Sequence, residues 1–549
     1  MKIVIVGGVA GGASAATRAR RLGENAQIIL LERGPDVSFA NCGLPYYIGG
    51  EIKDRSKLLV TTAERLKARF NLDVRTRSNV ESIDRQKKSV TIRDLASGRV
   101  YEESYDKLIL APGAAPIRPP ISGIDLPGIF TLRTMHDMDR IRGALDAGGV
   151  KSAVVVGAGF IGLEMVENLV RRGVAATLVE LQDQILPPLD KEMTAPLVES
   201  LRSRGVRLLL ANAAEAFESS PEGILVRLKS GESVAAQLVV LGVGVRPENA
   251  LAVASGLEVG PRGGIRVNEQ LQTSDPDIYA VGDAIETRDY LTGVATQIPL
   301  AGPANRQGRL AADHIFGRPA RFRGVQGTAI VGLFDRVAAI TGAAEKTLRR
   351  ANADYRAIYI HPAHHAGYYP GAEGMCLKVL FDPTSGAILG AQGVGGLGVD
   401  KRIDVLSVAI QAKMTVYDLE ELELAYAPQF GSAKDPVNMA GFVAAGWLRG
   451  DHPQIGVSAV LEKPENERPY LLDVRTPEEF GAGHLPGAVN LPVDDLRGRL
   501  GEVPRDRVVA AYCQVGQRGY LATRILRSAG IDAVNISGGY KTYLLFRGN

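Results

Sequence analysis

The chain has 549 residues, a length that predicts about three to four domains, each large enough to bury its own core. Hydrophobic residues make up 45% and charged residues 23%, as in ordinary globular proteins, which excludes disordered and fibrous classes. The formal net charge of +3 gives no electrostatic reason to expect nucleic acid or an anionic membrane surface as a partner. Since no apolar stretch approaches the roughly 20 residues of a membrane span, we also expect no membrane association.

The cysteines are few: Cys42, Cys376 and Cys513. An odd, sparse set does not build a disulfide framework, so we expect a reducing, cytoplasmic setting. The apolar N-terminus resembles a secretory signal, but it fits better as the first strand and turn described next. We interpret Cys376, in the apolar stretch 375–381, as a packing residue.

Two segments repeat one pattern, in which an apolar strand, a glycine-rich turn and a helix are followed by a strand that ends in an acid. The first has strand 2–6, the turn GGVAGG at 7–12, a helix to about residue 22, strand 27–31 and Glu32. The second has strand 152–156, the turn GAGFIG at 157–162, a helix to about residue 172, strand 176–179 and Glu180.

This pattern predicts a dinucleotide site in each segment. Small residues let the backbone approach a pyrophosphate at the helix N-terminus, where unpaired N–H groups and the helix dipole favour negative charge. The carboxylates of Glu32 and Glu180 are placed to accept hydrogen bonds from a ribose diol. The first turn departs from the usual pattern because Val9 stands at its middle glycine position.

Further along the chain, YDKLILAPG (105–113) reads as a strand and turn, TSDPDIYAVGD (273–283) as a strand that ends in Asp283, and AGP (301–303) as a helix start. With the two dinucleotide folds, these motifs resemble the two-dinucleotide-binding flavoprotein disulfide reductases over residues 1 to about 445. The resemblance implies FAD in the first fold, NAD(P)H in the second, contact of Asp283 with the ribityl-phosphate region of the flavin, and a subunit-pairing domain from about residue 326.

The same resemblance implies boundaries and site residues. The expected domains are an FAD domain at 1–112 and 247–325, an NAD(P)H domain at 113–246, a dimerisation domain at 326–447, a linker at 448–469 and a further domain at 470–549. The implied FAD residues are Gly7, Val9, Ala10, Gly12, Glu32, Arg33, Asn41, Val80, Ala111, Asp283 and Ala301. The implied nicotinamide-nucleotide residues are Gly157, Gly159, Phe160, Ile161, Gly162, Glu180 and Gly244. Glu180 favours NADH, because a carboxylate repels the 2′-phosphate of NADPH.

Charge and proline in residues 448–469 predict a linker that permits domain motion. Beyond it lie strand 470–474, a capping box TPEE (476–479) with proline at the first helical position, strand 508–512, the loop CQVGQR (513–518) and a helix to about residue 530. With DVR (473–475) and GHLPGA (483–488), these segments resemble a rhodanese domain. The whole chain is thus expected to be α/β: two Rossmann-like domains, an α+β interface domain and a rhodanese-like domain.

The loop from Cys513 to Arg518 suits a sulfur anion. Backbone N–H groups around the sulfur would hold a persulfide, with Arg518 and the helix N-terminus supplying positive potential. The loop is one residue shorter than that of a cysteine phosphatase, which has to encircle a phosphate. We therefore expect Cys513 and Arg518 to be catalytic residues for sulfur transfer.

The other candidate thiol, Cys42, lies in SFANCGLPYY (38–47) and lacks a partner cysteine, since Val37 and Tyr47 occupy the positions where one would stand. Beside a flavin, such a thiol forms its disulfide with an external molecule or cycles through a sulfenic or persulfide state. Asn41 and Pro45 predict the start of a short helix that lowers the pKa of Cys42. The alternative is a buried structural cysteine.

The SFANC run, together with GYYPG (367–371) and LAYAP (424–428), resembles the coenzyme A-disulfide reductases. This resemblance implies a mixed disulfide between Cys42 and coenzyme A, with Tyr368 and Tyr426 of the other subunit reaching the sulfur to stabilise or protonate the leaving thiolate. Interface packing is the alternative role for both tyrosines, and the preferred one for Tyr369. The implied coenzyme A contacts are Ser14, Arg18, Arg21, Ser38, Asn41, Asn305 and Lys434, although paired arginines at a helix end are also common on solvated surfaces.

The sequence thus predicts a homodimeric FAD enzyme that uses NADH to reduce coenzyme A disulfide, persulfide or polysulfide, with a fused sulfurtransferase domain and no metal. One alternative is an NADH oxidase or peroxidase that works through a sulfenic acid at a lone cysteine. The other is a sulfur-carrier or sensor protein whose C-terminal domain docks a partner.

Overall fold

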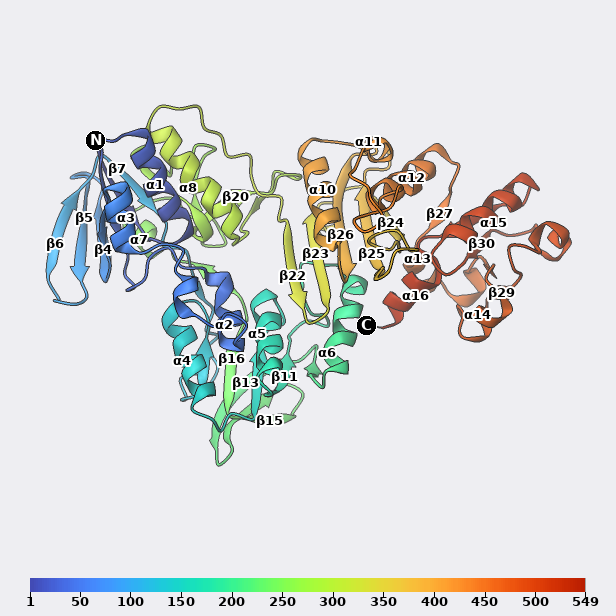
Figure 1. Cartoon of the computed structure of the whole chain (residues 1–549), viewed down its shortest axis with the longest axis horizontal. Helices are drawn as coiled ribbons and strands as arrows, with labels where there is room; N and C mark the ends of the chain where they lie inside the picture. Colours follow the sequence, from blue (N-terminus) through green and yellow to red (C-terminus); the bar gives the residue numbers. More distant parts are fainter. Residues whose placement is uncertain (549) are drawn as a thin grey trace. The chain divides into compact units, whose positions relative to one another are not determined.

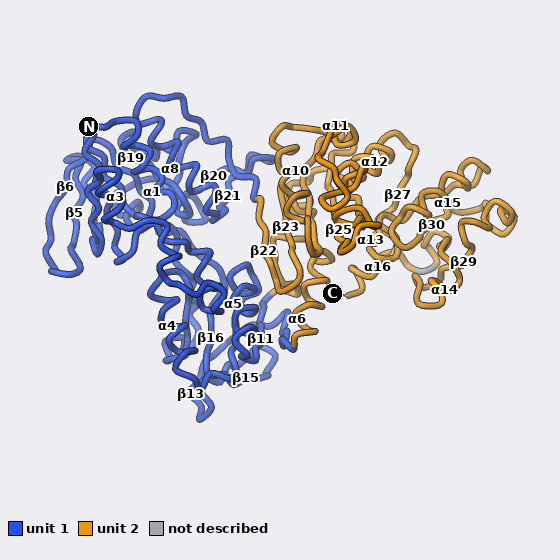
Figure 2. The backbone as a smooth tube through the Cα atoms, in the orientation of Figure 1, with its two compact units in different colours: residues 1–181, 205–327 blue, residues 182–204, 328–549 orange. Residues whose placement is uncertain are grey.

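A computed structural model describes residues 1–548 and divides them into two compact units (Figure 2). The first unit comprises residues 1–181 and 205–327. The second comprises residues 182–204 and the described residues from 328 onward. Each unit contains two sheets that carry predicted sites.

The first unit contains a parallel sheet with the strand order β19-β7-β1-β2-β3. Its strands are β1 (Lys2–Val6), β2 (Gln27–Leu31), β3 (Asp73–Arg75), β7 (Lys107–Leu110) and β19 (Ile278–Ala280). Parallel sheets are usually covered on both faces, and Ile3, Val4 and Ile5 of the central strand are fully buried. Helices α1 (Ala10–Leu22) and α8 (Ala301–Ile315) lie side by side next to this sheet (Figure 1).

A second parallel sheet of the same unit has the order β12-β11-β10-β16-β9. Its strands are β9 (Ile129–Thr131), β10 (Ser152–Val156), β11 (Ala175–Val179), β12 (Arg207–Leu209) and β16 (Leu238–Leu241). Helix α5 (Phe160–Arg171) joins β10 to β11. Both predicted strand-turn-helix-strand segments are therefore confirmed, with every predicted strand and helix end within one residue.

Shorter elements complete the first unit. Two three-stranded antiparallel sheets are formed by β4 (Ser78–Asp84), β5 (Ser89–Asp94) and β6 (Val100–Ser104), and by β13 (Ala214–Ser220), β14 (Gly223–Leu228) and β15 (Ser233–Ala236). The smaller pairings are β8 (Ala114–Pro116) with β17 (Val245–Pro247), and β18 (Ile265–Arg266) with β20 (Ile285–Arg288) and β21 (Ala295–Thr296). The remaining helices are α2 (Leu44–Gly49), α3 (Ala63–Phe70), α4 (Met135–Asp146) and α7 (Ala250–Ala254).

The second unit begins with an antiparallel sheet ordered β22-β23-β26-β25-β24. Its strands are β22 (Ala329–Leu333), β23 (Arg336–Gly342), β24 (Arg356–Ile360), β25 (Met375–Phe381) and β26 (Ile388–Gly395). The helices of this region are α6 (Ala195–Ser203), α9 (Glu345–Arg350), α10 (Val399–Gln411), α11 (Val416–Glu421) and α12 (Pro436–Arg449). Strands followed by helices make an α+β domain, as predicted for the subunit-pairing domain.

A parallel sheet ordered β27-β31-β30-β28-β29 forms the C-terminal part of the second unit. Its strands are β27 (Gln454–Ile455), β28 (Tyr470–Asp473), β29 (Val489–Asn490), β30 (Val509–Tyr512) and β31 (Ala533–Ile536). The helices are α13 (Val457–Leu461), α14 (Pro477–Gly481), α15 (Gln517–Ser528) and α16 (Gly539–Arg547). Thr476 and Glu479 form the predicted capping box of α14, and the α/β class predicted for the chain is confirmed.

The predicted linker is wrong for residues 454–461, because β27 adds an edge strand to the C-terminal sheet and α13 packs on α16. The two parts of this unit also contact each other directly. The Ser537 hydroxyl accepts a hydrogen bond from the Tyr359 backbone N–H at 3.1 Å, and His361 Nε2 lies 2.8 Å from the Thr542 hydroxyl oxygen. These contacts argue against a domain that swings freely on its tether.

Residues 182–204 also depart from the expected boundaries, because they join the second unit rather than the NAD(P)H domain. The buried Lys378 ammonium explains why: its Nζ lies 2.7 Å from Asp190 Oδ2, 2.6 Å from Glu192 Oε1 and 2.5 Å from Glu345 Oε1. Within the described chain these three carboxylates form the one group with metal-ligand geometry. Since Lys378 already supplies a cation there, the cluster is a buried ion-pair network.

Candidate functional site

The first candidate site is a cavity of about 1580 Å³ within the first unit, at the ends of β1, β2 and β7. Every residue predicted for FAD lines it except Gly12, which is buried beneath the turn. Crevices outside the carboxyl ends of parallel strands are where open α/β sheets bind nucleotides. The first glycine turn, Glu32 and Asp283 therefore meet in one cleft, as the family resemblance implies.

The glycine turn between β1 and α1 leaves no room for a side chain at Gly7 or Gly12. Gly7 has a φ of +98°, and a Cβ there would collide with the carbonyl oxygen of Ala111, as a Cβ on Gly12 would with the carbonyl oxygen of Gly7. Glu32 stabilises the turn, because its Oε2 accepts a hydrogen bond from the Gly8 N–H at 2.8 Å. A carboxylate has about four acceptor positions, so Glu32 keeps capacity for ribose hydroxyls. The cradle fits a dinucleotide.

The second glycine turn has the same construction. A Cβ on Gly162 would collide with the carbonyl oxygen of Gly157, whereas a Cβ on Gly159 would meet nothing within 4 Å. Glu180 Oε2 accepts a hydrogen bond from the Ala158 N–H at 2.7 Å. Phe160 and Ile161 begin α5, and Gly244 follows β16. The open side of Gly159 at the helix N-terminus leaves space for a pyrophosphate.

Cys42 lies in the cavity, exposed, in a 3-10 turn (Asn41–Gly43) that precedes α2. Desolvation by the surrounding protein and the nearby Glu164 carboxylate raise the pKa of Cys42, while Arg133 acts in the opposite direction. The predicted lowering of this pKa is therefore wrong. Asn41 does not cap the helix; its Nδ2 instead donates to the Arg133 carbonyl at 3.3 Å.

Three residues beside this thiol escaped the sequence analysis. Arg133 donates from its guanidinium to Asp283 Oδ2 at 3.0 Å. The Tyr46 hydroxyl lies 3.2 Å from Glu164 Oε1, and burial raises the pKa of Glu164 to about 7. The signal for Glu164 was its place two residues after the second fingerprint. Arg133 gave no signal, because it lies before α4, far from either motif.

The predicted coenzyme A residues fall into three groups. Ser14, Ser38, Asn41 and Asn305 line the cavity, and the Ser14 hydroxyl lies 2.6 Å from Asn305 Oδ1. Arg18 and Arg21 are not among its lining residues. Arg18 donates to Asp313 Oδ1 from Nε at 2.8 Å and from a terminal nitrogen at 2.6 Å, and Arg21 Nε donates to the Thr17 carbonyl at 3.1 Å. Lys434 is exposed in the second unit, just before α12.

The two predicted tyrosines form a pair on the surface of the second unit. The Tyr368 and Tyr426 hydroxyl oxygens are 3.0 Å apart, and the side chains are 76% and 49% exposed. Tyr369 instead contacts His365 edge-on, with ring centroids 5.6 Å apart. The paired hydroxyls of Tyr368 and Tyr426 converge in space although the sequence separates them by 58 residues.

The second candidate thiol, Cys513, follows β30 and is 1% exposed. Its loop turns at Gly516, with φ of +96°, and Asn535 Nδ2 donates to the Gly516 carbonyl at 3.0 Å. His452, from the segment predicted as linker, is buried, and its Nε2 lies 2.8 Å from Asn535 Nδ2. Arg518 is held by Glu479 through two hydrogen bonds of 2.7 Å.

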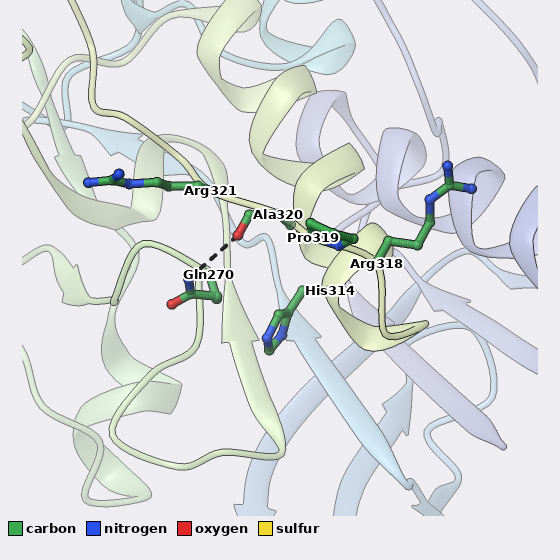
Figure 3. A pocket seen from close by; sticks show the side chains of 6 residues that line it. All are labelled: Gln270, His314, Arg318, Pro319, Ala320 and Arg321. Atoms are coloured by element: carbon green, nitrogen blue, oxygen red, sulfur yellow. Dashed lines mark hydrogen bonds between the residues drawn. The ribbon is translucent and has the colours of Figure 1, made fainter.

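Two other features carry no candidate chemistry. Cys376 is buried in β25, and desolvation raises its pKa far above the ordinary value, as a packing role requires. A separate pocket of about 480 Å³ (Figure 3) is lined by Gln270, His314, Arg318, Pro319, Ala320 and Arg321. Its polar groups are already bonded within the chain: Arg321 Nε lies 2.8 Å from Glu269 Oε2, and His314 Nδ1 lies 2.8 Å from the Tyr279 hydroxyl oxygen.

Among the described helices, none combines the length and apolar character that crossing a bilayer requires.

Comparison with known proteins covers almost all of the chain. Residues 1–308 match the family model for pyridine nucleotide-disulphide oxidoreductases, residues 328–436 match the dimerisation domain of that family, and residues 457–545 match the rhodanese-like domain. The coenzyme A disulfide reductase of Staphylococcus haemolyticus is 37% identical over 444 residues, which are 81% of this chain and 99% of that protein.

Two solved structures extend the similarity to the C-terminal part. Reduced CoADR-RHD from Bacillus anthracis is 48% identical, with a TM-score of 0.96, over 99% of this chain and 98% of that one. A NAD-dependent persulfide reductase from A. fulgidus is 38% identical, with a TM-score of 0.91, over 99% of this chain and 100% of that one.

Proposed function

Because the chain belongs to the pyridine nucleotide-disulphide oxidoreductase family and carries a rhodanese-like domain, we propose that it is an FAD-dependent enzyme that uses NADH to reduce coenzyme A disulfide, coenzyme A persulfide or polysulfide. Cys42 is its redox centre, and the C-terminal domain transfers sulfur through Cys513. The observation that carries this proposal is the single exposed thiol in a cleft built for a dinucleotide.

FAD is held by the first glycine turn, the Glu32 carboxylate and Asp283, which Arg133 positions. NADH is held by the second turn, where Glu180 fixes the backbone and selects against a 2′-phosphate. Bound flavin supplies the redox chemistry that side chains lack, taking an electron pair from NADH and delivering it to sulfur.

Cys42 performs the sulfur chemistry. As a thiolate it attacks one sulfur of coenzyme A disulfide, so that a Cys42–coenzyme A bond forms, the S–S bond of the substrate breaks and one coenzyme A thiolate leaves. Electrons from NADH then cleave the mixed disulfide. Two thiols and NAD⁺ result, with one proton taken up. With coenzyme A persulfide the products are coenzyme A and hydrogen sulfide.

Tyr368 and Tyr426 protonate or stabilise the leaving thiolate in a homodimer, where each subunit completes the site of the other. Their exposure and their 3.0 Å separation support this role. Ser14, Ser38, Asn41 and Asn305 contact coenzyme A in the cleft. Arg18 is the weakest member of the proposed set because Asp313 already neutralises it. A reducing cytoplasm suits three cysteines that are all free thiols.

The NADH oxidase alternative is less favoured. A sulfenic acid at a lone cysteine requires neither a paired tyrosine surface nor a sulfurtransferase loop, and this chain has both. A pure carrier or sensor role leaves the two dinucleotide cradles unexplained.

Steady-state kinetics of the FAD-loaded enzyme separate these functions. We expect NADH oxidation to be faster with coenzyme A disulfide or coenzyme A persulfide than with oxygen or hydrogen peroxide, and faster with NADH than with NADPH. Faster turnover with oxygen or peroxide would support the oxidase. A preference for NADPH would overturn the role given to Glu180.

A further inference from the structure

Glu479 and Arg518 form a charge pair at the mouth of the Cys513 loop. The Arg518 guanidinium donates one hydrogen bond to each Glu479 oxygen, both of 2.7 Å. Such a bidentate pair fixes both geometry and charge. Hydrogen bonding to Glu479 is also the largest cause that raises the pKa of Arg518, with a smaller contribution from Cys513. Arg518 therefore interacts with both a carboxylate and the thiol.

Glu479 is held in place and stays ionised. Its Oε2 also accepts the Thr476 N–H at 3.0 Å in the capping box of α14. Arg518 lowers the pKa of Glu479 to about 2, so the carboxylate is charged at neutral pH. The positive potential that Arg518 would give a sulfur anion is thus largely cancelled.

The other cations near the loop do not restore that potential. Arg475 is buried and donates to both oxygens of Asp473, while another of its nitrogens lies 3.2 Å from Gln514 Oε1. Lys541 is exposed at the start of α16, where solvent screens its charge. The loop residues Gln514, Val515 and Gln517 are uncharged. The positive potential of the loop therefore comes from its backbone N–H groups and the helix N-terminus, which suit a sulfur that carries a single negative charge.

We propose that Glu479 makes the Cys513 site select sulfur carried as an organic persulfide over the dianion thiosulfate. This inference rests on the sulfur transfer proposed above for Cys513. A persulfide brings one negative charge to the loop, and coenzyme A phosphates lie at the far end of a long arm, beyond a Debye length of about 8 Å. Thiosulfate brings two charges next to the Glu479 carboxylate. The 1% exposure of Cys513 also suits a slender donor.

Both transfers leave the same product on the protein. With a persulfide, the Cys513 thiolate attacks the terminal sulfur, the donor S–S bond breaks and a thiolate leaves. With thiosulfate, the attack breaks the S–S bond and sulfite leaves. In each case Cys513 gains one sulfur atom as a persulfide, without any external oxidant or reductant.

The test measures sulfur loading of Cys513 by mass spectrometry in the full-length Cys42→Ser protein, with coenzyme A persulfide, glutathione persulfide or thiosulfate as donor. We expect loading to be at least about tenfold faster with either persulfide. Glu479→Gln keeps the capping box, because glutamine also serves at that position. It should raise the thiosulfate rate about tenfold and change the persulfide rates less than about twofold. Glu478→Gln, on the exposed face of the same helix, is the matched control and should change neither rate.

Equal wild-type rates with persulfide and thiosulfate would overturn the inference, and this comparison needs no variant. An equal loss with both kinds of donor in Glu479→Gln, at unchanged melting temperature, would show that Glu479 only positions Arg518 and would also overturn it. If no donor places sulfur on Cys513, the proposed sulfur transfer itself fails, and the inference with it.

Discussion

Cys42 and Cys513 occupy opposite kinds of site. Cys42 is exposed in a 3-10 turn at a cavity of about 1580 Å³, and burial together with Glu164 holds its pKa above the ordinary value. Cys513 is 1% exposed and lies in a buried cluster with residues from other elements, among them Leu472, Leu491 and Ala522. In the proposed function, the open cleft needs cofactors and a second subunit before its thiol reacts. A closed loop is preorganised by its own backbone.

The largest expected effect separates the two thiols. Cys42→Ser should lower NADH-dependent reduction of coenzyme A disulfide on the order of 10⁴-fold, because the nucleophile is lost, while sulfur transfer to Cys513 persists. Cys513→Ser should leave disulfide reduction intact and abolish sulfur transfer. Parallel NADH-oxidation and sulfur-transfer assays measure both activities. If Cys513→Ser leaves the turnover of every sulfur substrate unchanged, the C-terminal domain has no part in the reaction.

Subunit mixing tests whether the open cleft is completed by a partner. Tyr426→Phe alone should lower activity about 10²-fold, as loss of a general acid does, and Cys42→Ser alone should be inactive. Mixed dimers of the two variants should regain activity, because one of their two sites contains both groups. If activity is not recovered although native mass spectrometry confirms subunit exchange, Tyr426 acts on Cys42 of its own subunit or only packs at the interface.

A third substitution tests whether the second glycine turn, residues 157–162, binds NADH. Gly159→Ala adds a methyl group where the protein has open space, so the fold should persist. The KM for NADH should nevertheless rise about tenfold, or ~1.4 kcal/mol, because the methyl group stands where the pyrophosphate approaches. Gly143→Ala, in α4 with equally open surroundings, is the control and should leave KM unchanged. An unchanged KM for NADH in Gly159→Ala would show that this turn does not bind NADH.

The smallest expected effect concerns the charge beside Cys42. Glu164 raises the pKa of Cys42 only when ionised, and its own pKa is about 7. Glu164→Gln should therefore lower the pKa of Cys42, so that alkylation by iodoacetamide becomes faster than in wild type above pH about 7. Below that pH the two proteins should converge. Glu51→Gln, which removes an exposed carboxylate paired with Arg171, should match wild type. Identical alkylation profiles for Glu164→Gln and wild type would show that Glu164 does not raise the pKa of Cys42.

The parts predicted from sequence were those in which local pattern determines structure. The glycine turns and their acids appear where expected because backbone sterics and strand ends are local properties, as at Gly7 and Glu32. Tyr368 and Tyr426 were identified only through the resemblance, since no periodicity joins residues so far apart. Arg133 and Glu479 were missed because their roles depend on the partners that folding brings to them, Asp283 and Arg518.

The linker error has the same origin. Charge and proline predicted an unpacked tether, but edge-strand pairing of Gln454 with Asn535 and the burial of His452 depend on tertiary contacts. Composition alone does not reveal such contacts. The pKa of Cys42 was likewise predicted from a helix start, while the structure shows that desolvation and Glu164 outweigh any such effect.

The central claim is that Cys42 forms a mixed disulfide with coenzyme A. Mass spectrometry of the denatured, non-reduced protein tests it most directly, before and after incubation with coenzyme A disulfide, with peptide mapping to locate the adduct. The account predicts one coenzyme A per subunit on Cys42, released by NADH when FAD is bound, and none on Cys42→Ser. Protein that carries no adduct as purified and forms none with coenzyme A disulfide, or an adduct on another cysteine, would contradict it.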